Sequence, residues 1–251
     1  MTTAETHAPT YSAPAELGGV FWFSTVTAFV LAFSIGANDV ANNFGTSVGS
    51  GAVSLRTAAL VAGVAEVLGA VTLGSGVSDT IVRGISDLDP PQCWGCGGGG
   101  GARTSLLMLG MACALAAGAA FLLAATFAAM PVSTTHSVVG AVLGMTLVSG
   151  GPGCVLWGWP GLASICASWA LSPALSGLLS AALLLYVKSF VLGGPDPAGA
   201  ALGRLPALGG LTVAMFAALL LLKARATRHW PAWASVLAAT ALGLGGAALT
   251  R

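Results

Sequence analysis

Residues 106–130, LLMLGMACALAAGAAFLLAATFAAM, form a run of 25 residues without a charged side chain. A helix needs about 20 apolar residues to cross the hydrocarbon core of a bilayer, so this run is long enough to span a membrane. In the whole chain, 56% of the residues are hydrophobic and only 7% are charged, whereas a soluble domain carries about 25% charged residues. Because so few charges are available to cover a surface that faces water, the sequence predicts an all-α integral membrane protein.

Further apolar runs bring the expected number of transmembrane helices to about six by the same length rule. They are residues 18–37, 57–77, 157–187, 205–222 and 233–249. The 36 glycines favour closely packed or broken helices. Residues 1–17 are expected to form a polar tail without the basic start of a cleaved leader. Residues 18–251 are predicted to form a single transmembrane domain.

Two segments do not fit as simple spans. Residues 38–55, NDVANNFGTSVGSGAVSL, and residues 131–149, PVSTTHSVVGAVLGMTLVS, each begin with polar or small residues and continue as a short apolar stretch. Proline and Ser/Thr residues are typical of the first turn of a helix. Irregular backbone persists at membrane depth only where it is buried or lines a cavity. Both segments are therefore predicted to be re-entrant or broken helices that line a cavity.

The first polar segment carries a carboxylate at a depth where charge is costly, about 2.5 kcal/mol or more on insertion scales. Asp39 stands beside Asn38, Asn42 and Asn43. Carboxylate and amide oxygens are the ligands that a hard cation such as sodium prefers. The alternative is an Asp–Asn cluster that only caps a helix end. We favour the cation site because several oxygen-bearing side chains occur together.

The second polar segment predicts an anion site. Ser133, Thr134 and Thr135 cluster at a helix start. Free N–H groups and the positive end of the helix dipole attract anions there, and hydroxyl groups add donors for phosphate oxygens. The alternative is ordinary N-capping, with His136 packed in the protein core.

Two further features stay open at this stage. Glu66 lies within an apolar run and either pairs with Arg56 or Arg83 or accepts a coupling proton. Cys93 and Cys96 form a CxxC loop, for which two free or bridged thiols are favoured over a metal or redox site, because no second pair is present. The remaining thiols of the apolar runs, Cys113 and Cys166, are expected to be small core residues.

The two polar segments resemble signature sequences of a known family. Residues 36–58, GANDVANNFGTSVGSGAVSLRTA, and residues 131–144, PVSTTHSVVGAVLG, are similar to those of the inorganic phosphate transporter (PiT) family of sodium- or proton-coupled phosphate symporters. Residues 78–88, 164–181 and 201–214 also resemble the first half of that family. The similarity runs from about Phe21 to the last span.

The resemblance implies a function and a set of site residues. The chain is expected to take part in cation-coupled inorganic phosphate transport, with Na⁺ or H⁺ as the coupling ion and no other cofactor. The implied phosphate-binding residues are Asn38, Thr46, Ser47, Ser133, Thr134 and Thr135; the implied coupling-ion residues are Asp39, Asn42 and Glu66; further possible members are His136 and Arg56. A multi-pass location in the plasma membrane is expected.

The family has two inverted repeats, each with its own copy of both motifs, with the substrate between them. This sequence holds one copy of each motif, Asn43 stands where the family has Ala or Ser, and the CWGCGGGGG loop is not a family feature. The expected partners are therefore a second copy of the chain, inserted in the opposite orientation, or a companion half; a truncated gene is the third alternative. A non-transporting phosphate-binding or regulatory subunit is the competing function. An enzyme is not expected, since no nucleophile–base pair or nucleotide loop is evident.

Overall fold

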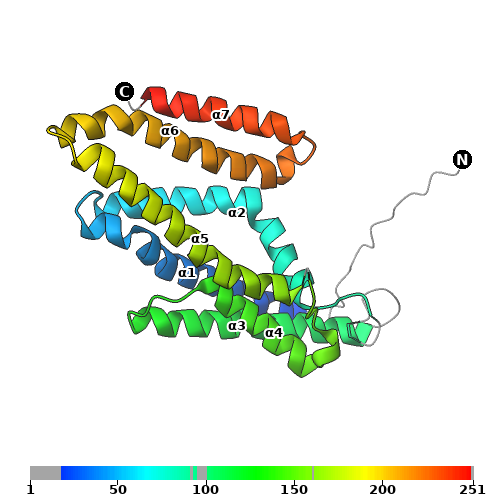
Figure 1. The fold of residues 1–251 in the computed structure, drawn as a ribbon. Helices are drawn as coiled ribbons and strands as arrows, with labels where there is room; N and C mark the ends of the chain where they lie inside the picture. The colour runs from blue at the N-terminus through cyan, green and yellow to red at the C-terminus, as the bar shows by residue number, and fades with distance from the viewer. Residues whose placement is uncertain (1–17, 91–92, 95–100, 160, 250–251) are drawn as a thin grey trace, which may run out of the picture. The chain divides into compact units, whose positions relative to one another are not determined.

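The computed structural model describes residues 18–90, 93–94, 101–159 and 161–249, and all long elements in these ranges are α-helices (Figure 1). The helices are α1 (Gly18–Gly49), α2 (Leu55–Ile85), α3 (Gly101–Phe127), α4 (Thr134–Ser149), α5 (Leu162–Val187), α6 (Pro197–Lys223) and α7 (Ala232–Leu249). Short 3-10 turns occur at Pro152–Cys154 and Arg225–Thr227, and a π-helical turn occurs at Lys188–Leu192. Six helices, all but α4, are long and apolar enough to cross a membrane. The predicted fold class and number of spans are confirmed.

Polar side chains fix where several helices begin. The hydroxyl groups of Ser54 and Ser133 accept hydrogen bonds from backbone N–H groups in the first turns of α2 and α4. The carboxylate of Asp196 accepts one from Gly199 N at the start of α6, where Pro197 takes the first helical position. Such caps satisfy N–H groups that have no partner within the helix. The beginning of α4 therefore lies where the sequence predicted it.

The described helices divide into two compact units. The first comprises residues 18–60 and 81–157, in which α3 packs against both α1 and α4. Its core contains Leu31 of α1 with Ala119 and Leu122 of α3, all nearly inaccessible. The close approach of α3 to α4 uses Gly110, because a Cβ built at that position would lie 2.6 Å from the Met145 side chain. Small residues thus allow the short helix α4 to lie against a membrane-length helix.

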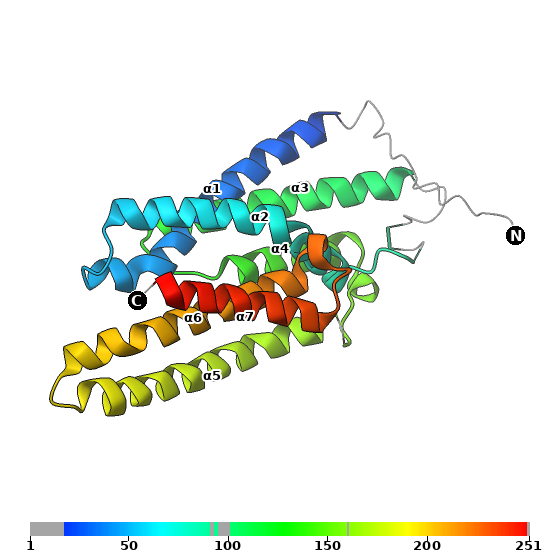
Figure 2. The same cartoon turned by 90° about the horizontal axis from the view of Figure 1, so that it is seen from above.

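The second unit comprises residues 61–80 and 158–249, and its tightest packing is between α6 and α7. These two helices run side by side in both views (Figure 1 and Figure 2). A Cβ built on Gly210 would lie 2.7 Å from the carbonyl oxygen of Gly243, and one on Gly243 would lie 2.6 Å from the carbonyl oxygen of Gly210. The two backbones therefore touch without intervening side chains, as membrane helices with small residues at their interface do.

Two expectations were wrong. The break predicted at Asn38 is absent, because α1 continues from Gly18 to Gly49 as one helix. No proline interrupts α1, and the side chain of Asn38 donates to Thr126 and Met130 rather than to its own backbone. Cys113 and Cys166 are exposed rather than packed in the core. Many large apolar side chains of the described helices are exposed as well, as expected of helices that face lipid.

The second polar segment agrees with its prediction. Between the end of α3 at Phe127 and the start of α4 at Thr134 the chain turns back, so that α4 packs against α3 as a hairpin. The helix α4 has 16 residues and is about 24 Å long, which is shorter than the hydrocarbon core of a bilayer. It is therefore a re-entrant segment whose first turn lies against α1.

Candidate functional site

A buried asparagine joins α1 to the α3–α4 hairpin. Asn38 is only 5% exposed. Its Nδ2 donates to Thr126 Oγ1 and to the carbonyl oxygen of Met130, both at 3.2 Å. Its Oδ1 accepts from Val132 N at 3.3 Å and from Asn42 Nδ2 at 3.1 Å. All the ordinary donor and acceptor positions of this amide group are used within the protein, so Asn38 fixes the turn against α1.

The turn that Asn38 holds has an unusual backbone. Ala129 has a φ of 55°, in the left-handed region, where an L-residue other than glycine is strained by about 1–2 kcal/mol. Met130 N donates to Ala125 O and Ala129 N donates to Thr126 O, which is the pattern of a Schellman motif at the end of α3. Ending α3 in this way leaves the carbonyl of Met130 to accept the hydrogen bond from Asn38.

The first turn of α4 contacts the carboxylate of α1 directly. Thr134 Oγ1 donates to Asp39 Oδ2 at 3.0 Å, although the two residues are 95 positions apart in sequence. Ser133 caps the helix, and its Oγ accepts from His136 N at 3.3 Å and also contacts His136 Nδ1. The first N–H groups of a helix have no partner within it and carry partial positive charge. A carboxylate and a helix N-terminus therefore meet at one place.

A polar cavity of about 410 Å³ opens at this meeting point. Asp39, Asn42 and Asn43 lie three and four positions apart, on one face of α1, and line it from one side. Its other side is formed by the start of α4 and the residues before it, Pro131, Val132, Ser133, Thr134 and Thr135. The cavity thus offers amide and carboxylate oxygens for a cation and hydroxyl and amide donors for an anion.

The structure separates the predicted residues into two groups. It brings Asp39 and Asn42 together with Ser133, Thr134 and Thr135 at the cavity, and Asn38 lies directly behind them. Other predicted members lie outside its lining; they are Thr46 and Ser47, farther along α1, Arg56 and Glu66 on α2, and His136. The assignment of ligand roles to either group stays a prediction.

Glu66 does not form either of the ion pairs that the sequence left open. Arg56, Glu66 and Arg83 all lie on the single helix α2. At 1.5 Å per residue, Arg56 and Arg83 stand about 15 and 26 Å from Glu66 along the axis, beyond the reach of an ion pair. Among the described residues, Glu66 is an exposed carboxylate in the interior of a membrane-length helix. Its role as a coupling residue stays a prediction.

His136 faces a separate cavity. This second cavity of about 450 Å³ is lined by Ala117, Gly118 and Phe121 of α3 and by His136, Ser137, Gly140 and Ala141 of α4. Its lining is mainly apolar, and none of these residues lines the cavity at Asp39. His136 contacts the candidate site through the Ser133 hydroxyl group.

Sequence reasoning missed two features of this unit. Thr126 and Met130 hold Asn38, but no local pattern indicates partners that are 88 and 92 positions away. Cys93 forms a disulfide with Cys154, whereas the sequence directed attention to Cys96, which lies outside the described residues. Within the described residues no group of His, Cys, Asp and Glu side chains is arranged to hold a metal ion.

Comparison with known proteins identifies the family. A model described as "Phosphate transporter family" matches residues 35–243, which include both polar segments. The chain belongs to the phosphate transporter family. It is 40% identical over 178 residues to an inorganic phosphate transporter of Arabidopsis thaliana named as chloroplastic, covering 71% of this chain and 28% of that protein. It is 39% identical over 215 residues to sodium-dependent phosphate transporter 1 of Mus musculus, covering 84% of this chain and 30% of that protein.

A solved structure supports the same assignment. A protein described as the sodium-dependent phosphate transporter superposes with a TM-score of 0.80 at 35% identity, covering 92% of this chain and 54% of that chain. The chain therefore spans about half the length of the solved structure and less than a third of these curated relatives. Together with six helices of membrane-spanning length, the family places the chain among integral, multi-pass membrane proteins.

Proposed function

We propose that this chain provides one wall of the binding site of a cation-coupled inorganic phosphate symporter. The observation that carries the proposal is the hydrogen bond from Thr134 to Asp39 beside a polar cavity. It joins the two polar segments, which are far apart in sequence, into one site with anion-binding and cation-binding groups. Membership of a phosphate transporter family, with relatives named as sodium-dependent, supports this substrate pair.

Phosphate is proposed to bind at the start of α4. Ser133, Thr134 and Thr135 line the cavity at the helix start, where the helix dipole favours an anion and where backbone N–H and hydroxyl groups can donate to phosphate oxygens. Asn38 contributes by holding the turn in place, since its amide group is already fully bonded. Thr46 and Ser47 are proposed to contact phosphate only if the site extends along α1.

The coupling cation, Na⁺ or H⁺, is proposed to bind at Asp39. An ionised carboxylate beside the anion site repels phosphate. A cation on Asp39, with Asn42 as an additional oxygen ligand, removes the repulsion and so makes phosphate binding depend on the cation. Thr134 contacts the same carboxylate, which links the two ligands structurally. Glu66 is retained as a second candidate for the coupling step.

The experiment measures uptake of labelled phosphate into proteoliposomes that contain the full chain, with and without a sodium or proton gradient. Asp39→Asn keeps the size of the side chain and removes its charge, so cation-dependent uptake should fall at least about tenfold. Asp89→Asn, in the loop after α2 and outside the cavity lining, is the matched control and should retain uptake. Wild-type uptake kinetics in Asp39→Asn would remove the basis for the coupling role.

The same experiment separates transport from the competing function of a phosphate-binding or regulatory subunit. The described cavity is formed by one hairpin and one face of α1, so we propose that a second copy of the chain or a companion half forms the opposite wall. Phosphate binding without uptake by the chain alone, and uptake once a companion is added, would support a half-transporter. Binding that never leads to uptake would support the regulatory subunit. A plasma membrane location is part of the proposal and is checked by surface biotinylation.

A further inference from the structure

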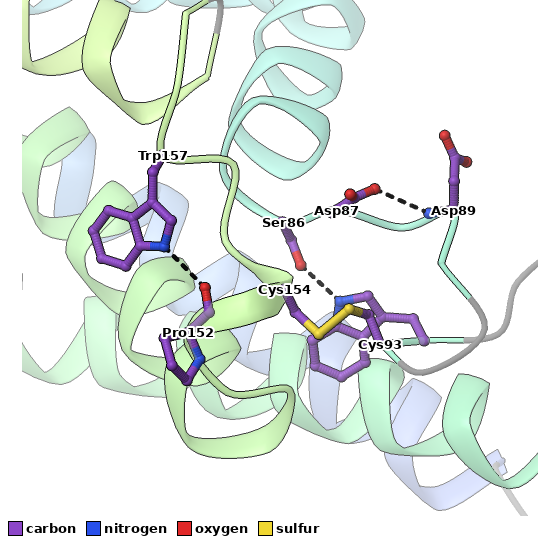
Figure 3. Close-up of a disulfide and its surroundings, with 8 residues drawn as sticks. Ser86, Asp87, Asp89, Cys93, Pro152, Cys154 and Trp157 are labelled. Atoms are coloured by element: carbon purple, nitrogen blue, oxygen red, sulfur yellow. Dashed lines mark hydrogen bonds between the residues drawn. A yellow bond between two sulfur atoms is a disulfide. The ribbon is translucent and has the colours of Figure 1, made fainter.

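The end of α4 opposite the candidate site is held by a disulfide. Cys93 and Cys154 are joined across 61 positions, and each is only 3% exposed. Trp94, which follows Cys93 in the chain, is fully buried, and its Nε1 donates to Ser86 Oγ at 2.8 Å. Figure 3 shows Ser86 close to the Cys93–Cys154 disulfide. The disulfide therefore lies inside a small packed cluster that joins the segment after α2 to the segment after α4.

This cluster packs directly on the last turn of α4. A Cβ built on Gly150, the residue that ends α4, would lie 2.9 Å from Cys154 Cβ and 3.2 Å from Cys154 Sγ. Gly150 N donates to the carbonyl oxygen of Thr146 at 2.8 Å, and Thr146 is fully buried. Little space remains between the disulfide and the helix end, so α4 cannot slide toward Cys154.

The other ties between the two segments are weak by comparison. Asp87 N donates to Cys154 O and Leu156 N donates to Ile85 O, both at 2.9 Å, around an isolated bridge between Ser86 and Val155. A pair of extended segments without further strands is only marginally stable. The covalent bond is therefore the strong connection that keeps the carboxyl end of α4 at the end of α2.

We propose that the Cys93–Cys154 disulfide positions the phosphate-binding start of α4, and so acts as a clamp on the candidate site. The helix is a short rod of about 24 Å, held at one end by the disulfide and at the other by Thr134 on Asp39 and Val132 on Asn38. An axial shift at the carboxyl end moves the first turn of α4 relative to the carboxylate of α1. This inference rests on the proposed function of that first turn.

The clamp also has a defined chemical environment. Disulfides form and persist in oxidising compartments, so we expect Cys93 and Cys154 to lie on the oxidising side of the membrane. A phosphine reductant breaks the Cys93–Cys154 S–S bond, and water is the only other reactant that this reduction needs. The phosphine gives two electrons to the S–S bond, each sulfur takes a proton, and the phosphine takes the oxygen of the water that supplied those protons.

The test uses the full chain in which Cys96, Cys113 and Cys166 are replaced by serine, so that only one pair of thiols remains. The oxidised protein, the same protein treated with a phosphine, and a form that also carries Cys93→Ser and Cys154→Ser are compared in proteoliposomes. Amide hydrogen exchange is measured in residues 132–137 and, as an internal control, in the α6–α7 contact around Gly210 and Gly243. Phosphate uptake is measured as KM and Vmax.

Opening the clamp should raise exchange in residues 132–137 about tenfold, with little change around Gly210 and Gly243. The KM for phosphate should rise about threefold while Vmax stays within about twofold, because the N-terminal groups of α4 are displaced rather than removed. The doubly substituted form should have the same exchange rates and KM as the reduced form, and the phosphine should not change them. Because the reduced protein is folded before the bond opens, failure of the substituted form to fold leaves the comparison intact.

Other outcomes overturn the inference. Unchanged exchange in residues 132–137 after reduction shows that the disulfide does not position α4, whatever the uptake result. An equal increase of exchange around Gly210 and Gly243 shows that the disulfide stabilises the protein in general and does not position α4. Absence of uptake in the oxidised protein counts against autonomous transport. Hydrogen exchange in residues 132–137 then tests independently whether the disulfide positions α4.

Discussion

Replacing Asn38 with alanine removes four hydrogen bonds, of which three join α1 to the α3–α4 turn and one joins Asn38 to Asn42 within α1. A typical hydrogen bond contributes a net of about 0.5–1.5 kcal/mol, so the four give about 2–6 kcal/mol. Asn42 and Val132 lie beside the open cavity, where water replaces their lost partner. The free energy of unfolding should therefore fall by about 2–3 kcal/mol, near the lower limit.

The assay is thermal unfolding of the purified chain in detergent, combined with phosphate uptake in proteoliposomes. For a chain of this length a loss of 2–3 kcal/mol corresponds to a decrease of about 5–10 °C in Tm. Asn38→Asp keeps an acceptor for Val132 N but places a negative oxygen against the carbonyl oxygen of Met130, so it should be no more stable than Asn38→Ala.

Asn43→Ala is the matched control, because Asn43 lines the cavity and is not one of the hydrogen-bond partners of Asn38. It should change Tm by less than about 2 °C, as surface substitutions usually do. If Asn38→Ala and Asn43→Ala lower Tm equally, or if Asn38→Ala leaves Tm unchanged, Asn38 does not hold the turn.

Further outcomes are expected from the same structure. Arsenate should compete with phosphate uptake, whereas sulfate should compete poorly if protonated phosphate oxygens donate to Asp39; equal inhibition by sulfate and phosphate contradicts this site. Ala129→Gly should raise Tm by about 2–4 °C, because glycine adopts a positive φ without strain, and a lower Tm would contradict the strained turn. Gly243→Ala should lower the free energy of unfolding by about 1–3 kcal/mol, because the new Cβ would lie 2.6 Å from the carbonyl oxygen of Gly210. Gly245→Ala, with nothing within 4 Å, should be neutral, and equal effects of both would argue against the α6–α7 contact.

The amino-acid sequence determined that the chain lies in a membrane, where its helices run, and which two polar segments stand out from the apolar spans. Uncharged runs of about 20 residues have few alternatives to membrane helices, because every backbone polar group must be satisfied within lipid. The start of α4 was also predictable, since Ser133 and Pro131 are local signals that act within one turn. Both polar segments that the sequence singled out contribute to the cavity.

The tertiary structure decided which polar groups face the cavity and which hold it together. Asn38 and Asp39 are adjacent in an asparagine-rich motif, yet Asn38 is buried and fully bonded while Asp39 lines the cavity. The continuity of α1 through this motif depends on the same contacts, because partners on α3 and its turn accept and donate the hydrogen bonds that would otherwise break the helix.

The pairing of Cys93 with Cys154 was likewise outside the reach of the sequence, where the nearby Cys96 was the more obvious partner. Local spacing determines caps, turns and helix lengths, since these depend on residues within about one turn of each other. Disulfide partners and hydrogen bonds across about 60–95 positions depend on how the helices pack, and packing is set by the whole chain at once. For this protein, the sequence therefore singled out the two segments that line the cavity, and the fold determined how these segments are held together.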